Sequence, residues 1–324
     1  MTRNLVSSIN DALRGEMRSD ESIVLYGQDV ARNGGVFRVT TGLHEEFGSR
    51  RCFDTPLAES GIVGTAVGMA MAGLRPIVEI QFSGFAGTAF NQIMCHVGRM
   101  RNRSRGAFTL PMVIRMPYGG GVRALEHHSE SMEALFGHVP GLTVVIPSTP
   151  HDAKGLLTAA IRHPDPVVFM EPKRVYQSPR QEVPDDSYLL PLGRARVVHH
   201  GTDLTIVSYG AQMREVLTAT EALTETGTSS EVIDLRTIYP YDAQTVIASV
   251  RKTGRLLVVH EGPRTFGVAA EVIAEVSEEA FMHLEAPPTR LTGTDTIIPL
   301  PRAERLYSIS PDHIVRAARK LVSY

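Results

Sequence analysis

The chain has 324 residues, of which 43% are hydrophobic and 21% charged, and its formal net charge is −2 at pH 7. This composition supplies enough apolar surface for a large core, and the nearly balanced charge excludes a protein driven electrostatically onto nucleic acid or an anionic membrane. The length predicts about two domains at the usual ~150 residues per domain. Cys52 and Cys95 are too few for a disulfide framework, which favours a reducing compartment.

The first element predicted in chain order is an amphipathic helix, because Leu5, Ile9, Leu13 and Met17 recur every four residues among polar side chains. This pattern differs from that of a secretory signal peptide. The longest apolar run, around residues 61–74, is shorter than the ~20 residues that a membrane-spanning helix needs. We therefore expect a cytoplasmic protein with neither a membrane nor a nucleic-acid partner.

Short β-branched runs then alternate with helical patterns along the first half of the chain. The predicted strands are 22–27, 75–82, 111–117, 142–148 and 166–172, and the predicted helices are 41–48, 60–73, 86–101 and 150–162. Continuously apolar strands separated by helices indicate a parallel sheet that is covered by helices on both faces.

The segment YQSPRQEVPDDSYLLPLG, residues 176–193, interrupts this alternation with prolines and charges, and it predicts a linker. The alternation then resumes with strands 204–210, 230–236 and 255–262 and with helices that begin near 211, 242 and 266. We therefore predict an α/β protein with two domains, which span residues 1–185 and 194–324.

The spaced glycines at 61–73 and the basic run at 99–105 are weak candidates for ligand binding. Gly61, Gly64, Gly68 and Gly73 lack the G-x-G-x-x-G spacing of a dinucleotide-binding turn, and small residues at helical spacing more often allow close packing on a neighbouring helix. The basic run at 99–105 leaves open a phosphate contact, although a solvated helix end or a subunit contact is favoured.

The loop YGGGVRALEHHSES, Tyr118–Ser131, is the first candidate site. Three consecutive glycines allow the backbone to approach a ligand closely. His127 and His128 follow, and three interpretations remain open: metal ligands, active-site acid/base or substrate contacts, and a structural loop. No third metal ligand at a recognised spacing accompanies these histidines.

Glu59 is the second candidate, because this carboxylate stands at the head of a small, apolar run that continues to Gly73. A buried carboxylate is costly unless another group pairs with it. The alternative interpretation is structural: a glutamate at a helix N-terminus is usually a capping residue, which the helix dipole favours.

A series of longer motifs follows one another along the chain. In order they are YGQDVARNGGVFRVTTGL, FDTPLAESGIVGTAVGMAMAGLRPIVEIQF, MPYGGGV, HHSES, PGLTVVIPSTPHDAKGLL, PDPVVFMEPKRVY and VIDLRTIYPYD. Together they resemble the β subunit of the thiamine-diphosphate-dependent first component of 2-oxo acid dehydrogenase complexes. The resemblance covers about residues 3 to 322 and is densest from 26 to 176. That family includes the pyruvate, branched-chain 2-oxo acid and acetoin dehydrogenases, and the motifs do not distinguish between these substrates.

The resemblance implies a pyrimidine-binding α/β domain, followed by a domain that resembles the C-terminal domain of transketolase. It places Glu59 opposite the aminopyrimidine ring of thiamine diphosphate, where a shared proton promotes deprotonation of the thiazolium carbon. Phe85 is then the aromatic residue that packs on the pyrimidine, and Gln81 is its neighbour. By the same resemblance, we expect His128 to face the active site and to assist acyl transfer to a lipoyl group.

The chain departs from the family pattern at several of these positions. His127 stands where tyrosine is common, residues 123–125 stand where glycine is frequent, and Gln28 replaces the usual glutamate before Asp29. Any acidic role at position 28 is lost, and the departures near the histidines leave the substrate open.

The resemblance also implies metals and partners. A potassium or similar monovalent cation is expected at backbone carbonyls of Met112, Ala160, Ile161, His163 and Asp165. No Gly-Asp-Gly motif occurs in the chain, so we expect a separate α subunit to hold the diphosphate and its Mg²⁺ in an assembly of two α and two β chains. A lipoyl-bearing acyltransferase is the further partner.

Three alternatives to a pyruvate or branched-chain 2-oxo acid dehydrogenase β subunit remain open. They are an acetoin dehydrogenase β subunit, a self-sufficient transketolase-like thiamine enzyme and a non-catalytic assembly partner. The missing Gly-Asp-Gly motif argues against the second, and the presence of Glu59, Phe85 and His128 argues against the third.

Overall fold

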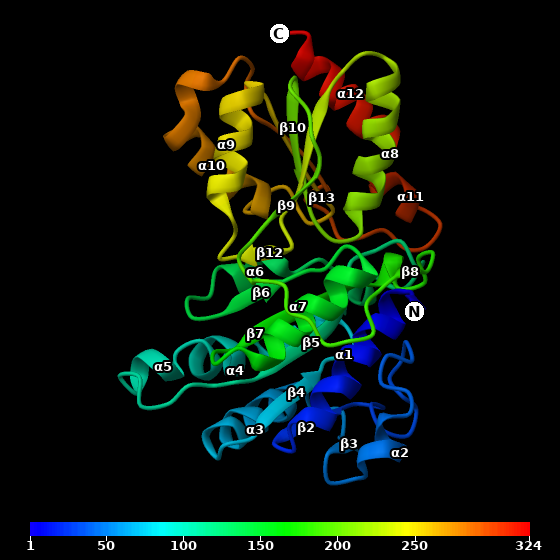
Figure 1. Cartoon of the computed structure of the whole chain (residues 1–324), viewed down its shortest axis with the longest axis vertical. Helices are drawn as coiled ribbons and strands as arrows, with labels where there is room; N and C mark the ends of the chain where they lie inside the picture. Colours follow the sequence, from blue (N-terminus) through cyan, green and yellow to red (C-terminus); the bar gives the residue numbers. More distant parts are fainter.

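The structure, a computed structural model, describes residues 1–324 and has two lobes, each of which is a β-sheet covered by helices (Figure 1). The part built on the seven-stranded sheet is called the N-terminal lobe, and the part built on the five-stranded sheet the C-terminal lobe. The predicted α/β class with parallel sheets is confirmed.

The N-terminal sheet has the strand order β12-β6-β7-β5-β4-β2-β3. Its strands are β2 (Ile23–Gly27), β3 (Cys52–Asp54), β4 (Arg75–Glu79), β5 (Val113–Tyr118), β6 (Thr143–Val145), β7 (Val167–Pro172) and β12 (Thr237–Tyr239). All neighbouring strands are parallel except β12, which pairs antiparallel with β6. Because β12 comes from the second half of the chain, the C-terminal lobe contributes an edge strand to the N-terminal sheet.

Helices cover both faces of this sheet. The helices are α1 (Leu5–Ser19), α2 (Leu43–Phe47), α3 (Glu59–Met71), α4 (Phe90–Gln92), α5 (Met100–Arg103), α6 (Glu133–Gly137) and α7 (Pro150–Arg162). The apolar stripe predicted for the first helix is confirmed, since Leu5, Ile9, Leu13 and Met17 are buried in one core cluster with α7. The other face belongs to a larger cluster that includes α3.

The helix predicted at 86–101 is wrong as a single element. The segment divides into a 3₁₀-helix (Ser83–Ala89), α4, a π-helical turn (Ile93–Val97) and α5. Close backbone approaches explain the irregularity: a Cβ on Gly84 would lie 2.2 Å from the carbonyl oxygen of His127, and one on Gly98 would lie 3.0 Å from that of Pro140. The segment therefore bends to fit against two loops.

The C-terminal sheet has the order β14-β13-β10-β11-β9, in which only β9 is antiparallel to its neighbour. Its strands are β9 (Arg196–His199), β10 (Leu204–Ser208), β11 (Ser230–Asp234), β13 (Leu256–His260) and β14 (Thr289–Thr292). Helices α8 (Gln212–Glu225) and α12 (Pro311–Val322) cover one face, α9 (Ala243–Thr253) and α10 (Val268–Ala280) cover the other, and α11 (Glu304–Tyr307) lies near the junction of the lobes (Figure 1).

The segment predicted as a linker is fixed on the N-terminal lobe. Its β8 (Gln181–Glu182) pairs antiparallel with β1 (Thr2–Arg3) at the start of the chain. Lys154 Nζ on α7 donates hydrogen bonds to the carbonyl oxygens of Pro184 (2.6 Å) and Asp185 (2.8 Å). The segment therefore connects the lobes along a defined path.

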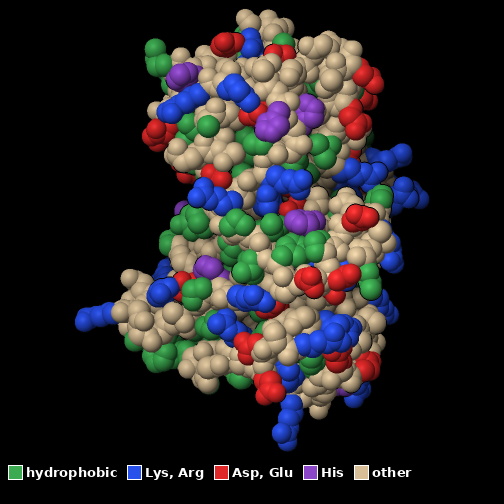
Figure 2. Space-filling view, in the orientation of Figure 1, with side chains coloured by type: hydrophobic (Ala, Val, Ile, Leu, Met, Phe, Trp, Pro, Cys, Tyr) green, Lys and Arg blue, Asp and Glu red, His purple; other side chains and the backbone are tan.

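The two lobes meet at a waist, and on the face shown in Figure 2 acidic and basic side chains are interspersed over both of them. One core cluster of 40 buried residues crosses the junction, since it contains both Ile146 of the N-terminal lobe and Tyr209 of the C-terminal lobe. The contact between the lobes is therefore partly hydrophobic.

Candidate active site

The residues predicted for the thiamine site lie at the carboxyl ends of the N-terminal strands. Gln28 follows β2, Gln81 follows β4, and the glycine-rich loop follows β5. In open α/β sheets, ligands bind in the crevice outside this edge. The topology alone therefore places these residues where a ligand site is expected.

Glu59 is the first residue of α3, and two neutral donors hold its half-buried carboxylate. Gln28 Nε2 donates to Glu59 Oε1 at 3.1 Å, and Thr88 Oγ1 donates to Oε2 at 3.1 Å. The position at a helix N-terminus also favours negative charge. Each carboxylate oxygen accepts more than one hydrogen bond, so the fixed group retains capacity for a ligand donor.

Phe85 and His128 are brought together in an aromatic cluster with Phe82 and His127. The ring centroid of His128 lies 4.5 Å from that of Phe82 and 5.1 Å from that of Phe85, and both pairs meet edge to face. The His127 ring lies 5.8 Å from Phe85. His128 Nδ1 is buried without a hydrogen-bond partner, so this nitrogen is available to a ligand or a water.

Thr88 connects Glu59 to this cluster. Its hydroxyl also contacts the Phe85 carbonyl oxygen at 3.0 Å, so the carboxylate and the aromatic ring are fixed to one segment. Gln81 is fixed by another segment, since its Nε2 donates to Asp29 Oδ2 at 2.9 Å. Asp29 adopts a positive φ of 58° directly after Gln28, which turns the chain as it leaves β2.

Sequence reasoning missed Lys173 as a contact of the histidine loop. Its ammonium donates to the carbonyl oxygen of His128 and lies 5.3 Å from the centre of the Phe82 ring. Burial lowers the pKa of Lys173 to about 8, although Glu261 and Glu304 oppose the shift. The only signal in the sequence was the position of this lysine directly after β7. Thr88 carried no signal, since nothing in the sequence placed it near Glu59.

A buried ionic cluster lies in the middle of the same sheet. Arg115 on β5 donates from Nη1 to Glu79 Oε2 (2.9 Å) and from Nε to Glu171 Oε1 (2.7 Å). Tyr176 donates to the other oxygen of Glu171 at 2.6 Å. Burial raises the pKa of Glu79. Burial alone would lower the pKa of Arg115, but the adjacent carboxylates of Glu171 and Glu79 outweigh it and raise that pKa. The cluster ties β4, β5 and β7 together behind the site.

The residues predicted for the monovalent cation lie together at the opposite edge of the sheet. Met112 precedes β5, Ala160 and Ile161 end α7, and His163 and Asp165 lead into β7. Three of the carbonyl oxygens already accept one hydrogen bond each: Val167 N donates to Met112, His163 N to Ala160, and Arg75 Nη1 to Ile161. A fourth, that of Asp165, lies 3.0 Å from His163 Nδ1. Asp165 Oδ1, in contrast, is buried without a partner.

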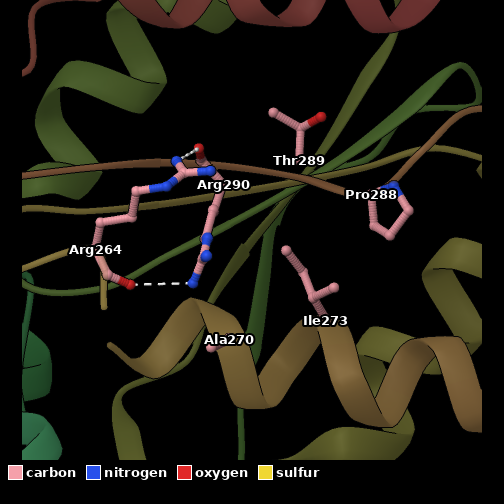
Figure 3. A pocket seen from close by; sticks show the side chains of 6 residues that line it. All are labelled: Arg264, Ala270, Ile273, Pro288, Thr289 and Arg290. Atoms are coloured by element: carbon pink, nitrogen blue, oxygen red, sulfur yellow. Dashed lines mark hydrogen bonds between the residues drawn. The ribbon is translucent and has the colours of Figure 1, made fainter. Parts of the chain in front are cut away.

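Two hollows differ in their relation to the site. An apolar hollow of about 290 Å³ adjoins Glu59 and is lined by Tyr26, Phe53, Thr55, Pro56, Ala58, Gly61, Ile62, Thr65 and Met69. The larger hollow, of about 530 Å³, is in the C-terminal lobe, between Arg264, Arg290 and α10 (Figure 3). Arg290 Nη1 donates there to the Arg264 carbonyl oxygen at 3.0 Å. No predicted site residue lines either hollow, but the smaller one includes Ala58, which directly precedes Glu59 in the chain.

The structure shows no group of three or more His, Cys, Asp or Glu side chains placed to hold a metal ion. None of its helices combines the length and the apolar character that crossing a bilayer requires. Cys52 and Cys95 are both free thiols.

Comparison with known proteins defines the class of this chain. Residues 2–179 match the family described as "Transketolase, pyrimidine binding domain", and residues 193–314 match "Transketolase, C-terminal domain". A solved structure titled "Split gene transketolase, inactive beta4 tetramer" superposes with a TM-score of 0.81 over 99% of this chain and 98% of that chain, at 22% identity. The chain therefore has the two-domain transketolase fold.

Curated relatives define the family more closely. The chain is 55% identical over 317 residues to "Pyruvate dehydrogenase E1 component subunit beta" of Acholeplasma laidlawii, and this covers 98% of the chain and 97% of that protein. It is 49% identical to the protein of the same name from Bacillus subtilis, over 99% of the chain and 98% of that protein. The chain belongs to the family of pyruvate dehydrogenase E1 component β subunits.

Proposed function

We propose that this chain is the β subunit of a 2-oxo acid dehydrogenase of the pyruvate type. It acts in oxidative decarboxylation that depends on thiamine diphosphate, with acyl transfer to a lipoyl group. The observation that carries the proposal is the 55% identity of this chain to a pyruvate dehydrogenase E1 component β subunit. It is supported by the position of Glu59, Phe85 and His128 beyond the carboxyl ends of neighbouring strands. The fold class alone would leave the reaction open.

The residues at this edge fit the pyrimidine end of thiamine diphosphate. Glu59 is held by neutral donors only, so its carboxylate can share a proton with a ring nitrogen. Phe85 offers an aromatic face and Gln81 an amide at the rim, and the smaller hollow adds apolar surface next to Ala58, which precedes Glu59. When bound, the cofactor supplies a carbon nucleophile for the 2-oxo acid carbonyl and accepts the electron pair that decarboxylation releases.

His128 is the group in this chain proposed to act during acyl transfer. Its Nδ1 has no partner, and its ring is fixed between Phe82 and Phe85. A histidine with a free ring nitrogen can hold or deliver a proton near neutral pH. His127 is exposed and lies beside Phe85, so we assign it a contact with the substrate or with the lipoyl group.

A separate α subunit is proposed to hold the diphosphate and Mg²⁺, in an assembly of two α and two β chains. The outer face of α3 supports a partner chain. Gly61 and Gly68 are exposed there, and a Cβ on Gly68 would meet no atom within 4 Å. The glycine spacing therefore leaves room for another helix beside Glu59, where a shared active site would form. A lipoyl-bearing acyltransferase is the proposed second partner.

Three further assignments belong to this proposal. The chain works as two domains, residues 1–185 and 194–324, although β12 of the second pairs in the first sheet. A monovalent cation binds the carbonyl cluster near Asp165, supported by the unpaired Asp165 Oδ1. The two free thiols fit the reducing cytoplasm.

Reconstitution tests the proposed function. Purified alone, the chain should bind thiamine diphosphate weakly and show no decarboxylase activity, because nothing on it neutralises the diphosphate. Addition of a co-expressed α subunit and Mg²⁺ should restore activity, with pyruvate preferred over branched-chain 2-oxo acids and acetoin. Full activity of the single chain would instead identify a self-sufficient thiamine enzyme, and inactivity with every 2-oxo acid would refute the proposal.

A further inference from the structure

The glycine-rich loop that follows β5 is attached to the C-terminal lobe through its backbone amides. Gly121 N donates to Glu304 Oε1 at 2.6 Å, and Arg123 N donates to Glu304 Oε2 at 3.0 Å. Gly120 N donates to Glu261 Oε2 at 3.1 Å. Two carboxylates of one lobe therefore bind three backbone donors of a loop in the other lobe, and charged acceptors make such bonds strong.

The loop conformation suits these carboxylates. Gly119, Gly121 and Arg123 have φ values of +82°, +86° and +56°, which turn successive amides toward the anion as in a backbone nest. The fit is close, because a Cβ on Gly119 would lie 2.7 Å from Glu261 Oε1. Gly119 is therefore needed both for its dihedral angle and for the space that Glu261 occupies, whereas a Cβ on Gly121 would lie 2.4 Å from Cδ of Arg174.

Both carboxylates are themselves fixed in the C-terminal lobe. Glu304 begins α11 and is only 5% exposed, and Glu261 directly follows β13. Tyr307 of α11 donates to the Glu261 carbonyl oxygen at 3.3 Å, which joins the two supports. A group held on rigid elements can fix a loop more closely than the loop fixes itself.

The far end of the same loop has a second attachment to the C-terminal lobe. Glu133, at the start of α6, accepts a hydrogen bond from the hydroxyl of Tyr209 at 2.8 Å. His127 and His128 lie between this attachment and the amides bound by Glu261 and Glu304. The C-terminal lobe thus holds both ends of the segment that carries the histidines.

We propose that Glu261 and Glu304 form a carboxylate clasp, which positions His127 and His128 over Phe85 by fixing the loop backbone. Both carboxylates bind backbone amides of the loop and are assigned no contact with the reacting atoms, so both are positioning residues. The catalytic consequence rests on the proposed function, whereas the clasp itself does not depend on it.

Glu304→Gln is the sharpest test, because it preserves shape while replacing one acceptor oxygen by an NH₂ donor. One of the two loop amides then faces a donor, and the loop should open more often. Trypsin should therefore cleave the full chain after Arg123 about tenfold faster or more than it cleaves the wild type. Cleavage after Arg105, in a separate exposed loop, should not change. Glu278→Gln, on the exposed side of α10, is the matched control and should alter neither site.

Glu261→Gln is the second variant, in case Glu304→Gln does not fold. Hydrogen exchange of the wild-type chain needs no variant, and it should show protected Gly121 and Arg123 amides. Fast exchange of these amides, or unchanged cleavage after Arg123 in a folded variant, would overturn the clasp.

The positioning role is read from the assembled enzyme with its α subunit. Glu304→Gln should lower kcat for lipoyl acylation about tenfold, while KM for the 2-oxo acid and thiamine diphosphate affinity stay within about twofold. Faster cleavage with an unchanged kcat would overturn the positioning role. If the wild-type assembly has no activity, the proposed function fails, and proteolysis still decides the clasp.

Discussion

The carboxyl ends of the parallel strands meet different surroundings in the two lobes. In the N-terminal lobe this edge carries Glu59, Gln81 and Phe85, which are only half-buried. In the C-terminal lobe the residues beyond the same edge include Tyr209, Leu235 and Arg236, which are at most 8% exposed. Both lobes follow the topology that places ligand sites at this edge, so coverage decides which edge stays open to a ligand.

The N-terminal lobe itself closes the second edge. After β11 the chain turns into β12, which joins the N-terminal sheet, and Ile146 N donates to the Arg236 carbonyl oxygen at 2.8 Å. Burial then opposes charge at the covered groups: it raises the pKa of Asp234 to about 7 and lowers that of His260 to about 4. The covered edge of the C-terminal sheet, with its neutral buried groups, therefore stabilises the contact between the lobes. The open edge of the N-terminal sheet remains accessible to a ligand.

Glu59→Gln should break the open edge with the largest effect. The amide cannot take the proton that a carboxylate shares with the pyrimidine, so the rate should fall by about 10²–10⁴. Folding should be retained, because the carbonyl oxygen of the substituted side chain can still accept from Gln28 or Thr88. Thiazolium proton exchange, followed by NMR in the enzyme assembled with its α subunit, is the measurement. Near-native exchange would remove Glu59 from the site.

Glu133→Gln should test the covered junction, because it replaces a buried carboxyl group, which ionises as the pH rises, with a neutral amide. Burial raises the pKa of Glu133 to about 7 from an ordinary value near 4.5, with Glu261 adding to the shift and Tyr209 opposing it. The folded state then binds a proton that the unfolded chain releases between about pH 4.5 and 7. In the wild type, the contribution of Glu133 to the free energy of unfolding should therefore fall by about 3 kcal/mol as the pH rises through this range, and stay low above pH 7.

Denaturant unfolding of both proteins from pH 4 to 8 measures this effect. Glu133→Gln cannot titrate, so its stability relative to the wild type should increase steadily through that range and level off above it. His260 titrates in both proteins and cancels in the difference. A stability difference that does not change with pH would show that Glu133 has the same pKa in the folded and unfolded states, which would contradict the shift by burial.

Much of the fold could be predicted because local patterns and tertiary packing agree. The apolar strand at 23–27 and the helix with Leu5, Ile9, Leu13 and Met17 bury the faces that their periodicity defines. The prediction of one helix at 86–101 was wrong, although the sequence pattern there is helical. The chain passes close to other backbone segments at Gly84 and Gly98, and the helix is interrupted. β12 was missed because three residues, Thr237–Tyr239, carry no periodicity, and their pairing with β6 is set by the lobe contact.

The candidate site divides in the same way. Glu59 and His128 were candidates from their own sequence surroundings, the resemblance added Phe85 and gave each residue a role, and the structure brings the three to one edge. Their partners depend on contacts between distant segments: Thr88 with Glu59, Lys173 with the His128 carbonyl, and Glu304 with the Gly121 amide. No spacing in the sequence encodes these pairs. Gln28, first noted only for a lost acid, donates a hydrogen bond to Glu59.

His128→Ala should separate the two halves of the reaction at the open edge. If His128 serves acyl transfer, overall complex activity should fall about 10²-fold, at the low end of the range for a positioned acid or base. Dye reduction by the first component alone should fall much less. His127→Ala is the matched control and should be milder in both assays, because the exposed His127 ring meets only Phe85 at 5.8 Å. Equal losses in both assays for His128→Ala would contradict the assignment.

The smallest expected effect lies at the opposite edge of the N-terminal sheet, where the proposed cation would bind. Potassium should raise the Tm of the chain by about 2–4 °C over N-methyl-D-glucamine chloride at the same ionic strength, because it binds only the folded carbonyl cluster. Asp165→Ala should abolish the difference, since it removes the carboxylate whose Oδ1 has no partner. Arg101 pairs with the other oxygen of Asp165, so Arg101→Ala is the control and should keep the potassium response. Equal Tm values for the wild type in both salts would contradict a bound cation at this edge, where Arg75 already donates to the Ile161 carbonyl oxygen at 3.0 Å.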